Sequence, residues 1–359
     1  MKAHIIGAGP VGSHLAKLLA KDYEVTVYEQ GRIGKPVQCT GILTKSIEGI
    51  MPMRKAFLMN RFKSVRLHAG KEEVRIKNDD YLVCRTRFDN FLAERAKDEG
   101  ARYLLNKSFV GLSNNKIEIK DVNTKRTDKI KLGKKDVLVG ADGPRSKVSQ
   151  AIGNKPLTCW FGAQAVVKKK VDKSEYQVYF GDVCPGFFAW DVPESSTRTR
   201  IGLAASKESG ILFKRFLDKN KIEEMQGGLI PRYDPRIRTQ RDNIFIVGDA
   251  AGQVKATTGG GIIPGMQAAG CLAEALLEGK DYERVWRKTV GNRLDLHLSL
   301  RNILDKFKEK DYEELLRSAG NKKVKRLLSE TDRDKGGITL LMKMILAEPK
   351  LLKFARFLL

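Results

Sequence analysis

The chain has 359 residues, and its 67 basic and 43 acidic side chains give a formal net charge of +24. With 42% hydrophobic and 31% charged residues, the composition is that of a folded protein and argues against intrinsic disorder. The charge favours anionic partners, but no nucleic-acid-binding motif accompanies it, so we predict no nucleic-acid partner.

The five cysteines are odd in number and lack zinc-ligand spacing, so we predict neither a disulfide framework nor a metal site. No uncharged apolar stretch reaches the roughly 18 residues that a membrane-spanning helix needs. The first residues already form a strand pattern instead of a signal peptide. The sequence therefore predicts a cytoplasmic protein.

The chain opens with a strand at 2–6, a G-x-G-x-x-G turn, a helix at 13–21 and a second strand at 24–29. In such a unit the first glycine permits the tight turn, the second lets backbone N–H groups approach a pyrophosphate, and the third allows close helix–strand packing. A carboxylate at the end of the second strand accepts ribose hydroxyls and repels a 2′-phosphate. We predict a dinucleotide site made of Gly7, Gly9, Pro10, Val11, Gly12, Glu29 and Gln30.

The remaining chain alternates between strand patterns and helix patterns. Residues 63–78 predict paired strands, 88–100 a helix, 136–140 a buried strand, 160–205 a second and mostly antiparallel sheet, and 282 onward charged helices. Nucleotide-type motifs recur at 7–29, 139–148 and 247–270, with the second sheet between them, so the cofactor domain must be discontinuous. We predict a cofactor domain of 1–62, 79–153 and 232–285, a substrate domain of 63–78 and 154–231, and a helical C-terminal region of 286–359.

Two later motifs resemble those of FAD-dependent enzymes. The segment 139–146 resembles the Asp-Gly motif of flavoprotein hydroxylases, and 247–252 resembles the motif whose aspartate holds the ribityl or pyrophosphate region of FAD. The resemblance implies FAD as cofactor and an α/β, p-hydroxybenzoate hydroxylase-like fold with a Rossmann-type domain. It adds Asp142, Gly143, Gly248, Asp249, Gly252, Gly259, Gly260, Gly261 and Ile262 to the predicted site, with the glycine run 259–261 under the isoalloxazine ring, where only glycine lets the backbone come close.

A narrower resemblance rests on the loop 34–41, the start of the helix near Arg85 and the segment Pro185–Pro193. Together they resemble the geranylgeranyl reductase family over roughly residues 1–285. Pro185–Pro193 looks like that family's Tyr-x-Trp-x-Phe-Pro substrate motif, with phenylalanine at 188 and valine at 192. The resemblance implies a prenylated lipid substrate bound by Phe188, Trp190 and Pro193, cofactor contacts from Arg85, Cys39 and Gly41, and Cys39 as the candidate catalytic residue.

Hydrogenation of an isolated alkene needs both a hydride from reduced flavin and a proton from the protein, because no carbonyl stabilises a carbanion. The external electron donor, whether ferredoxin, a nicotinamide or a deazaflavin, leaves no trace in the sequence. Two alternatives stay open: a monooxygenase or halogenase of the same fold, and a flavin- or lipid-binding protein without catalysis. An ordinary core strand is an alternative interpretation of the aromatic residues, and a small packing residue is an alternative interpretation of Cys39.

The tail contains two amphipathic apolar segments, 340–346 and 351–359, interspersed with lysine and arginine. One interpretation is an interfacial element that rests on an anionic membrane, which would make the protein peripheral on the inner face. The other is a set of helices packed on the catalytic domains with a solvated basic face.

Overall fold

The computed structural model describes residues 1–358 and divides the chain into two compact units. The first comprises Met1–Pro36, Arg85–Cys159 and Ile230–Asp295, and the second comprises Val37–Cys84, Trp160–Leu229 and the residues from Leu296 onward. Three separate stretches of sequence thus build the first unit.

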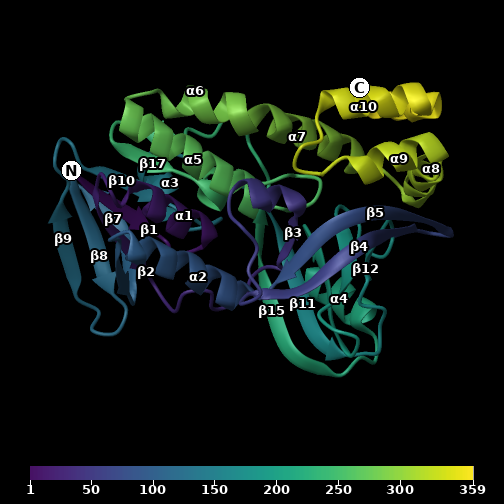
Figure 1. The fold of residues 1–359 in the computed structure, drawn as a ribbon, viewed down its shortest axis with the longest axis horizontal. Helices are drawn as coiled ribbons and strands as arrows, with labels where there is room; N and C mark the ends of the chain where they lie inside the picture. Colours follow the sequence, from purple (N-terminus) through teal and green to yellow (C-terminus); the bar gives the residue numbers. More distant parts are fainter. Residues whose placement is uncertain (359) are drawn as a thin grey trace. The chain divides into compact units, whose positions relative to one another are not determined.

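The first unit is built on a six-stranded sheet with the strand order β16-β17-β10-β1-β2-β6 (Figure 1). Its strands are β1 (Lys2–Ile6), β2 (Glu24–Glu29), β6 (Arg102–Leu105), β10 (Val137–Gly140), β16 (Gln240–Arg241) and β17 (Ile244–Ile246). All neighbours pair in parallel except β16 and β17. Helix α1 (Pro10–Leu19) connects β1 to β2 and packs against both α2 (Arg85–Asp98) and α5 (Ile262–Glu278). This is a Rossmann-type arrangement.

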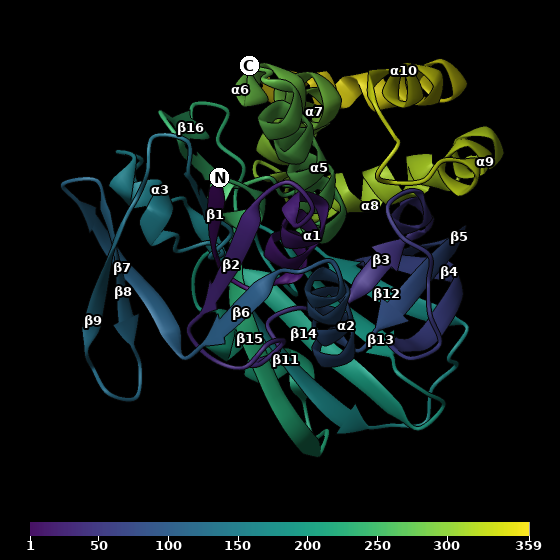
Figure 2. The same ribbon diagram turned by 60° about the vertical axis from the view of Figure 1, so that its left-hand side comes forward.

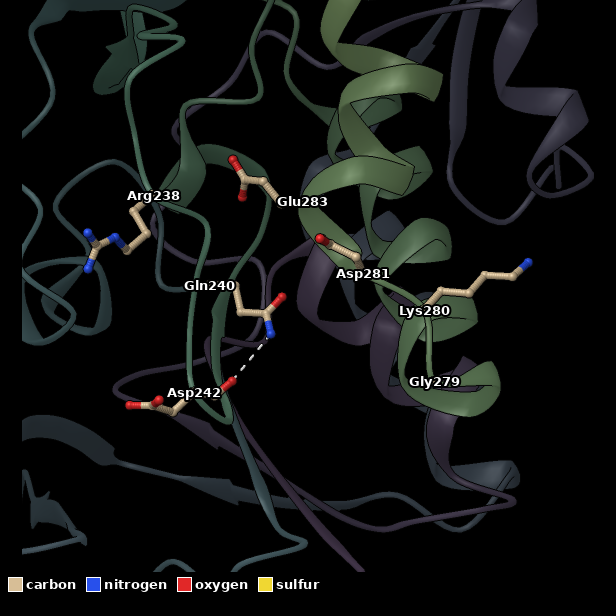
Figure 3. Close-up of a pocket in the computed structure, with 7 residues that line it drawn as sticks. All are labelled: Arg238, Gln240, Asp242, Gly279, Lys280, Asp281 and Glu283. Carbon is tan, nitrogen blue, oxygen red and sulfur yellow. Dashed lines mark hydrogen bonds between the residues drawn. The ribbon is translucent and has the colours of Figure 1, made fainter.

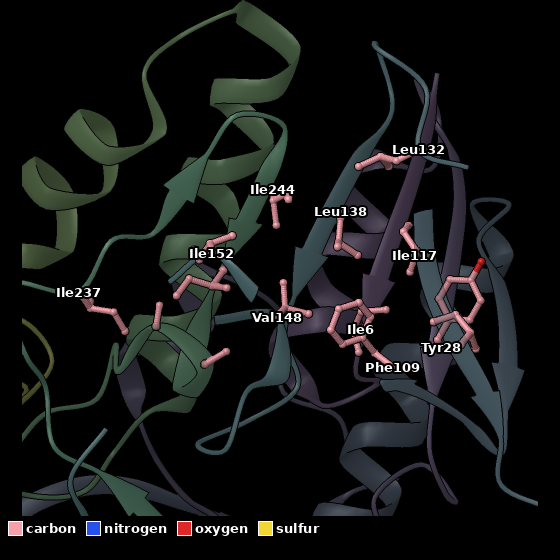
Figure 4. Packing of buried hydrophobic residues seen from close by; sticks show 14 residues of the cluster. Ile6, Tyr28, Phe109, Ile117, Leu132, Leu138, Val148, Ile152, Ile237 and Ile244 are labelled. Carbon is pink, nitrogen blue, oxygen red and sulfur yellow. The ribbon is translucent and has the colours of Figure 1, made fainter. Parts of the chain in front are cut away.

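The core of this unit joins the parallel sheet to a three-stranded antiparallel sheet (Figure 4). The smaller sheet consists of β7 (Lys107–Ser113), β8 (Lys116–Asp121) and β9 (Thr127–Lys131). Ile6, Tyr28 and Leu138 of the parallel sheet are buried together with Phe109 and Ile117 of the smaller one. The remaining short elements are α3 (Lys147–Ala151), η2 (Gly248–Ala251), α6 (Tyr282–Trp286) and η3 (Arg287–Gly291).

The second unit contains an eight-stranded sheet with the order β15-β11-β14-β13-β12-β4-β5-β3 (Figure 2). Its elements are β3 (Ile42–Thr44), η1 (Lys45–Gly49), β4 (Leu58–Ala69), β5 (Glu72–Val83), β11 (Cys159–Lys168), β12 (Glu175–Phe180), β13 (Phe188–Pro193), β14 (Arg198–Ala205), α4 (Ser209–Leu217) and β15 (Ile222–Pro231). Ala189 and Leu203 pack in one cluster with Phe213 of α4. Because side chains alternate along a strand, Phe188 and Trp190 lie on the sheet face opposite to α4.

The C-terminal helices are α7 (Asn292–Leu304), α8 (Glu309–Ala319), α9 (Lys322–Glu330), α10 (Ile338–Ala347) and η4 (Pro349–Leu358). Helices α8 and α9 pack on β5, so this region joins the second unit instead of standing apart. The predicted paired strands 63–78 are the inner part of the longer strands β4 and β5, and β3 pairs with β5. The second unit therefore also takes 37–62 and 79–84, which the sequence had assigned to the cofactor domain.

The predicted fold class is confirmed: a discontinuous Rossmann-type domain, a largely antiparallel sheet and a helical C-terminal region. Across residues 1–358, no helix is both long enough and apolar enough to cross a membrane.

Candidate functional site

The glycine-rich turn between β1 and α1 contains glycines of two kinds. A Cβ atom on Gly7 would lie 2.3 Å from the carbonyl oxygen of Ala141, and one on Gly12 would lie 2.1 Å from the carbonyl oxygen of Gly7. Gly7 also has φ +103°, which strains other residues. A Cβ atom on Gly9 would meet nothing within 4 Å, although Gly9 is the N-cap of α1 and precedes Pro10. The packing of the chain requires Gly7 and Gly12, whereas Gly9 leaves open space at a helix N-terminus, where an anion binds well.

Glu29 is the last residue of β2, and its carboxylate accepts hydrogen bonds from the glycine-rich turn and from Gly31. Its Oε2 accepts the N–H of Ala8 at 2.9 Å, and its Oε1 accepts the N–H of Gly31 at 3.0 Å. Each carboxylate oxygen keeps lone pairs for a further donor, such as a ribose hydroxyl. Gln30, also predicted as a cofactor contact, is exposed.

The second glycine turn packs directly on α1. Gly248 has φ +70°, and a Cβ atom there would lie 3.1 Å from the Val11 side chain. Gly265 of α5 leaves room for the same valine, since its Cβ would lie 2.7 Å from Val11 Cγ2. Gly252 caps η2 in the left-handed conformation. The turn that begins at Gly7 and the turn that begins at Gly248, about 240 residues apart in the sequence, thus pack together in one domain, as the sequence predicts.

Arg85 forms an ion pair with Asp89 and also affects the pKa of Asp249. Its guanidinium donates to both oxygens of Asp89 at 2.9 Å, and Asp89 is buried. Burial raises the pKa of Asp89, and the charge of Arg85 opposes that rise. Burial also raises the pKa of Asp249 to about 6, and Arg85 again lowers it. Asp89 was not predicted as a site residue, although the i, i+4 spacing of arginine and aspartate on one helix could have identified it.

The glycine run 259–261 leads into α5, which begins at Ile262. Gly259 has φ +67°, and a Cβ atom on Gly261 would lie 2.5 Å from Asp249 Oδ1. A Cβ atom on Gly260 would lie 3.0 Å from Cε of Lys255, a buried lysine that sequence reasoning missed. The run therefore packs between a carboxylate and a lysine side chain, and larger residues would displace one of them.

Asp142 accepts hydrogen bonds at the N-terminus of α3. Its Oδ2 accepts the N–H groups of Lys147 at 2.8 Å and Val148 at 3.4 Å, and burial raises its pKa. Gly143 follows with φ +79°, which suits glycine. The structure thus explains Asp142 as an acceptor at the N-terminus of α3 and Gly143 as a turn residue, while their cofactor contact stays a prediction.

In the second unit, the loop that carries Cys39 is held by buried polar side chains. The N–H of Gly41 donates to Cys39 Sγ at 3.3 Å. The Thr40 hydroxyl donates to Gln164 Oε1 at 2.8 Å, and the Arg200 guanidinium donates to the Thr40 carbonyl oxygen. Gln164 and Arg200 are buried and lie more than 120 residues from this loop in the sequence, so no local pattern predicts their part in it.

The same glutamine holds the predicted substrate strand β13. The Trp190 indole N–H donates to Gln164 Oε1 at 2.8 Å. The indole lies over Gly202 of β14, where a Cβ atom would be 2.6 Å from the ring. The ring centroids of Phe188 and Trp190 are 5.8 Å apart, which agrees with the predicted common face. Trp190 and Pro193 are buried, and Phe188 is half-buried. One side chain, Gln164, therefore couples the Cys39 loop to the aromatic strand.

A separate cavity of about 570 Å³ lies in the first unit, beside β16 and the connection from α5 to α6 (Figure 3). It is lined by Arg238, Gln240, Asp242, Gly279, Lys280, Asp281 and Glu283. None of these is a predicted site residue. Within the described part of the chain, no cluster of three or more His, Cys, Asp or Glu side chains could hold a metal ion.

No protein-family model matches the chain. A digeranylgeranylglycerophospholipid reductase from Methanothrix thermoacetophila is 29% identical over 360 residues, which cover 90% of this chain and 92% of the relative. Over most of its length the chain is thus similar to digeranylgeranylglycerophospholipid reductases. The predicted resemblance is confirmed. The crystal structure of a geranylgeranyl bacteriochlorophyll reductase-like protein from Thermoplasma acidophilum superimposes with a TM-score of 0.83. The two chains are 20% identical, and the match covers 100% of this chain and 99% of that one.

The chain also shares its fold with enzymes of other activity. A flavin-dependent brominase, 16% identical, matches with a TM-score of 0.72 over 99% of both chains. At that identity the likeness shows a common fold and carries no information about the reaction. The likeness to the Thermoplasma protein extends past residue 285, where the sequence motifs end, through the C-terminal helices.

Proposed function

We propose that the chain is an FAD-dependent reductase that hydrogenates the isolated double bonds of geranylgeranyl chains in archaeal-type membrane lipid precursors. The proposal rests on the near whole-length likeness to digeranylgeranylglycerophospholipid reductases, together with the turn at Gly9 and the aromatic strand β13. A monooxygenase or halogenase shares the fold, but the sequence relatives favour reduction.

The residues of the first unit suit FAD. The open space at Gly9 and the N-terminus of α1 would take the pyrophosphate, and Glu29 would accept the ribose hydroxyls. Asp249 would accept a hydroxyl of the ribityl chain, and the glycine run 259–261 would lie along the ring system. Reduced FAD would supply the hydride, with its electrons coming from an external donor.

The second unit would supply the proton donor and the apolar surroundings of the alkene. An isolated alkene accepts hydride only if a proton reaches its other carbon, and positive charge develops on the more substituted carbon. Phe188 and Trp190 present ring faces that would hold an apolar chain, exclude water and stabilise that charge. Cys39, kept in place by Gly41, Thr40 and Gln164, is the candidate proton donor.

The test uses the full chain loaded with FAD, reduced with dithionite under anaerobic conditions and mixed with a geranylgeranylglyceryl phospholipid. Flavin should reoxidise as lipid is consumed, and mass spectrometry should show a gain of about 2 mass units for each double bond reduced. Cys39→Ala should retain flavin and its reduction by dithionite but lose most lipid-dependent reoxidation. Unchanged alkenes under every donor, or a product that gains oxygen only in air, would reject the proposal.

A further inference from the structure

Helix α10 exposes an apolar stripe. Ile338, Met342 and Leu346 are 65%, 59% and 80% exposed, and Leu352 of η4 is 56% exposed. The four-residue spacing places the first three on one face of the helix. No residue of α10 is buried. A contiguous apolar surface of this kind marks an interaction site more often than an incidental exposure.

Basic side chains accompany the stripe. Residues 338–357 contain four basic residues and one acidic residue, Glu348. Two of the basic residues pair with carboxylates of α8, Lys353 with Glu314 and Arg356 with Asp311. Lys343, next to Met342, and Lys350, between the two helices, are exposed. The carboxylate of Glu348 accepts a hydrogen bond from Asn321 Nδ2 at 3.0 Å. The face is therefore apolar with a cationic border.

The position of α10 is secured by the segment before it, through polar contacts with the sheet of the same unit. Arg333 pairs with buried Asp80 at 2.6 Å. The Thr44 hydroxyl donates to Asp334 at 2.8 Å, and the N–H of Ser46 donates to Asp332 at 2.8 Å. These contacts hold residues 332–334, which lead into α10, and they do not involve the outer face of the helix. The exposed apolar side chains are therefore not needed to position α10.

A row of aromatic rings connects this region to the substrate strand within the second unit. Ring centroids are 6.0 Å apart between Phe188 and Phe180, 5.6 Å between Phe180 and Tyr312, 5.2 Å between Tyr312 and Phe307, and 5.0 Å between Phe307 and Phe357 of η4. A continuous row of aromatic ring contacts thus extends from β13 to η4, which follows α10.

We propose that α10 and the start of η4 form a peripheral docking face for an anionic lipid bilayer. Ile338, Met342, Leu346 and Leu352 enter the interface, while Lys343 and Lys350 contact the headgroups. A second copy of the chain is a poorer occupant, because two surfaces with the same basic border, on chains of net charge +24, repel each other. The inference deepens the proposed function, since it names where a membrane lipid is taken up, but docking itself needs no turnover.

The test is co-sedimentation of the full chain with phosphatidylglycerol vesicles and with phosphatidylcholine vesicles. The wild type should bind the anionic vesicles at least about fivefold more tightly, and added salt should weaken that binding. The double variant Met342→Glu/Leu346→Glu should lose binding by more than about tenfold. Ile211→Glu/Met225→Glu is the matched control, because it replaces two exposed apolar residues of the same unit with the same charges and should change binding less than about twofold.

The variant Met342→Ser/Leu346→Ser, which adds no charge, should also weaken binding, and thermal unfolding checks that each variant is folded. The inference would be overturned by any of three results: the stripe and control variants bind vesicles equally, the wild type binds both kinds of vesicle equally, or the wild type is a dimer that the stripe variants dissociate. Turnover of lipid dispersed in detergent should be unchanged in the stripe variants. Absence of that turnover in the wild type would count against the proposed function alone.

Discussion

Gly9 offers a sharp test of the cofactor site, because nothing in the folded chain requires a glycine there. Its backbone has φ −69° and ψ 179°, a conformation open to alanine, and an added Cβ meets no atom within 4 Å. Alanine restricts the unfolded chain, a gain of about 0.4–1 kcal/mol, and is a poorer N-cap than glycine by a similar amount. Gly9→Ala should therefore leave the stability of the apoprotein within about 1 kcal/mol of wild type.

Cofactor binding should respond differently. The added methyl group would occupy the space through which the pyrophosphate of the proposed FAD would reach the backbone N–H groups of α1, so at least one hydrogen bond to a charged group should be lost. Such a bond contributes about 1.5–3 kcal/mol, which corresponds to a roughly 10- to 150-fold weaker Kd for FAD. The Kd is measured by titrating apoprotein with FAD and following flavin fluorescence.

Gly12→Ala is the opposite control. Its Cβ would lie 2.1 Å from the Gly7 carbonyl oxygen, so α1 must move, at a cost of about 1–3 kcal/mol or more. This variant should lower the thermal unfolding midpoint of the apoprotein, whereas Gly9→Ala should not. The reasoning is refuted if Gly9→Ala binds FAD within twofold of wild type, or if it destabilises the apoprotein as much as Gly12→Ala does.

Three other substitutions test the polar contacts. The pKa of Asp249 is raised to about 6 in the folded protein, so the folded state favours the protonated carboxyl. The stability that this preference contributes is present at low pH and is lost as pH rises from about 4 through 6. Asp249→Asn should remove that part of the pH dependence of the unfolding midpoint. Arg85→Met should destabilise the protein by about 3–5 kcal/mol in denaturant unfolding, because it leaves buried Asp89 unpaired, and Asp89→Leu in the same chain should restore part of the loss. Gln164→Leu should lower lipid turnover without changing FAD affinity, since it unpairs the Trp190 indole and the Thr40 hydroxyl. Gln164→Glu keeps the side-chain oxygen that accepts both bonds but loses the amide donor to Gln226 Oε1, so it should preserve more turnover than the leucine variant. Equal losses in the leucine and glutamate variants would contradict that role.

The glycine turn of the candidate cofactor site is predictable because its determinants are local. The strands 2–6 and 24–29 have the predicted bounds, and Gly7 and Gly12 are glycines because atoms a few residues away, or on the adjacent strand, exclude a side chain. Sequence patterns record such short-range constraints directly. The domain boundaries are harder, because strand length depends on the partner: β4 and β5 extend each other to Leu58 and Val83 through pairing that the 63–78 pattern does not contain.

The substrate half depends on contacts that only the sheet register creates. Gly202 and Gln164 look like ordinary strand residues, and they matter because β14 and β11 bring them to Trp190 across an antiparallel sheet. The departure from the family motif at Phe188 has a similar explanation. Its ring stacks on Phe187 at 4.4 Å and lies near Phe180 and Trp190, so its ring contacts are aromatic. Loss of the tyrosine hydroxyl therefore leaves this aromatic packing in place, and the polar anchor of the strand is the Trp190 N–H on Gln164. The proposed wall for an apolar chain thus depends on ring faces and on one buried glutamine, not on the hydroxyl that the motif would have supplied.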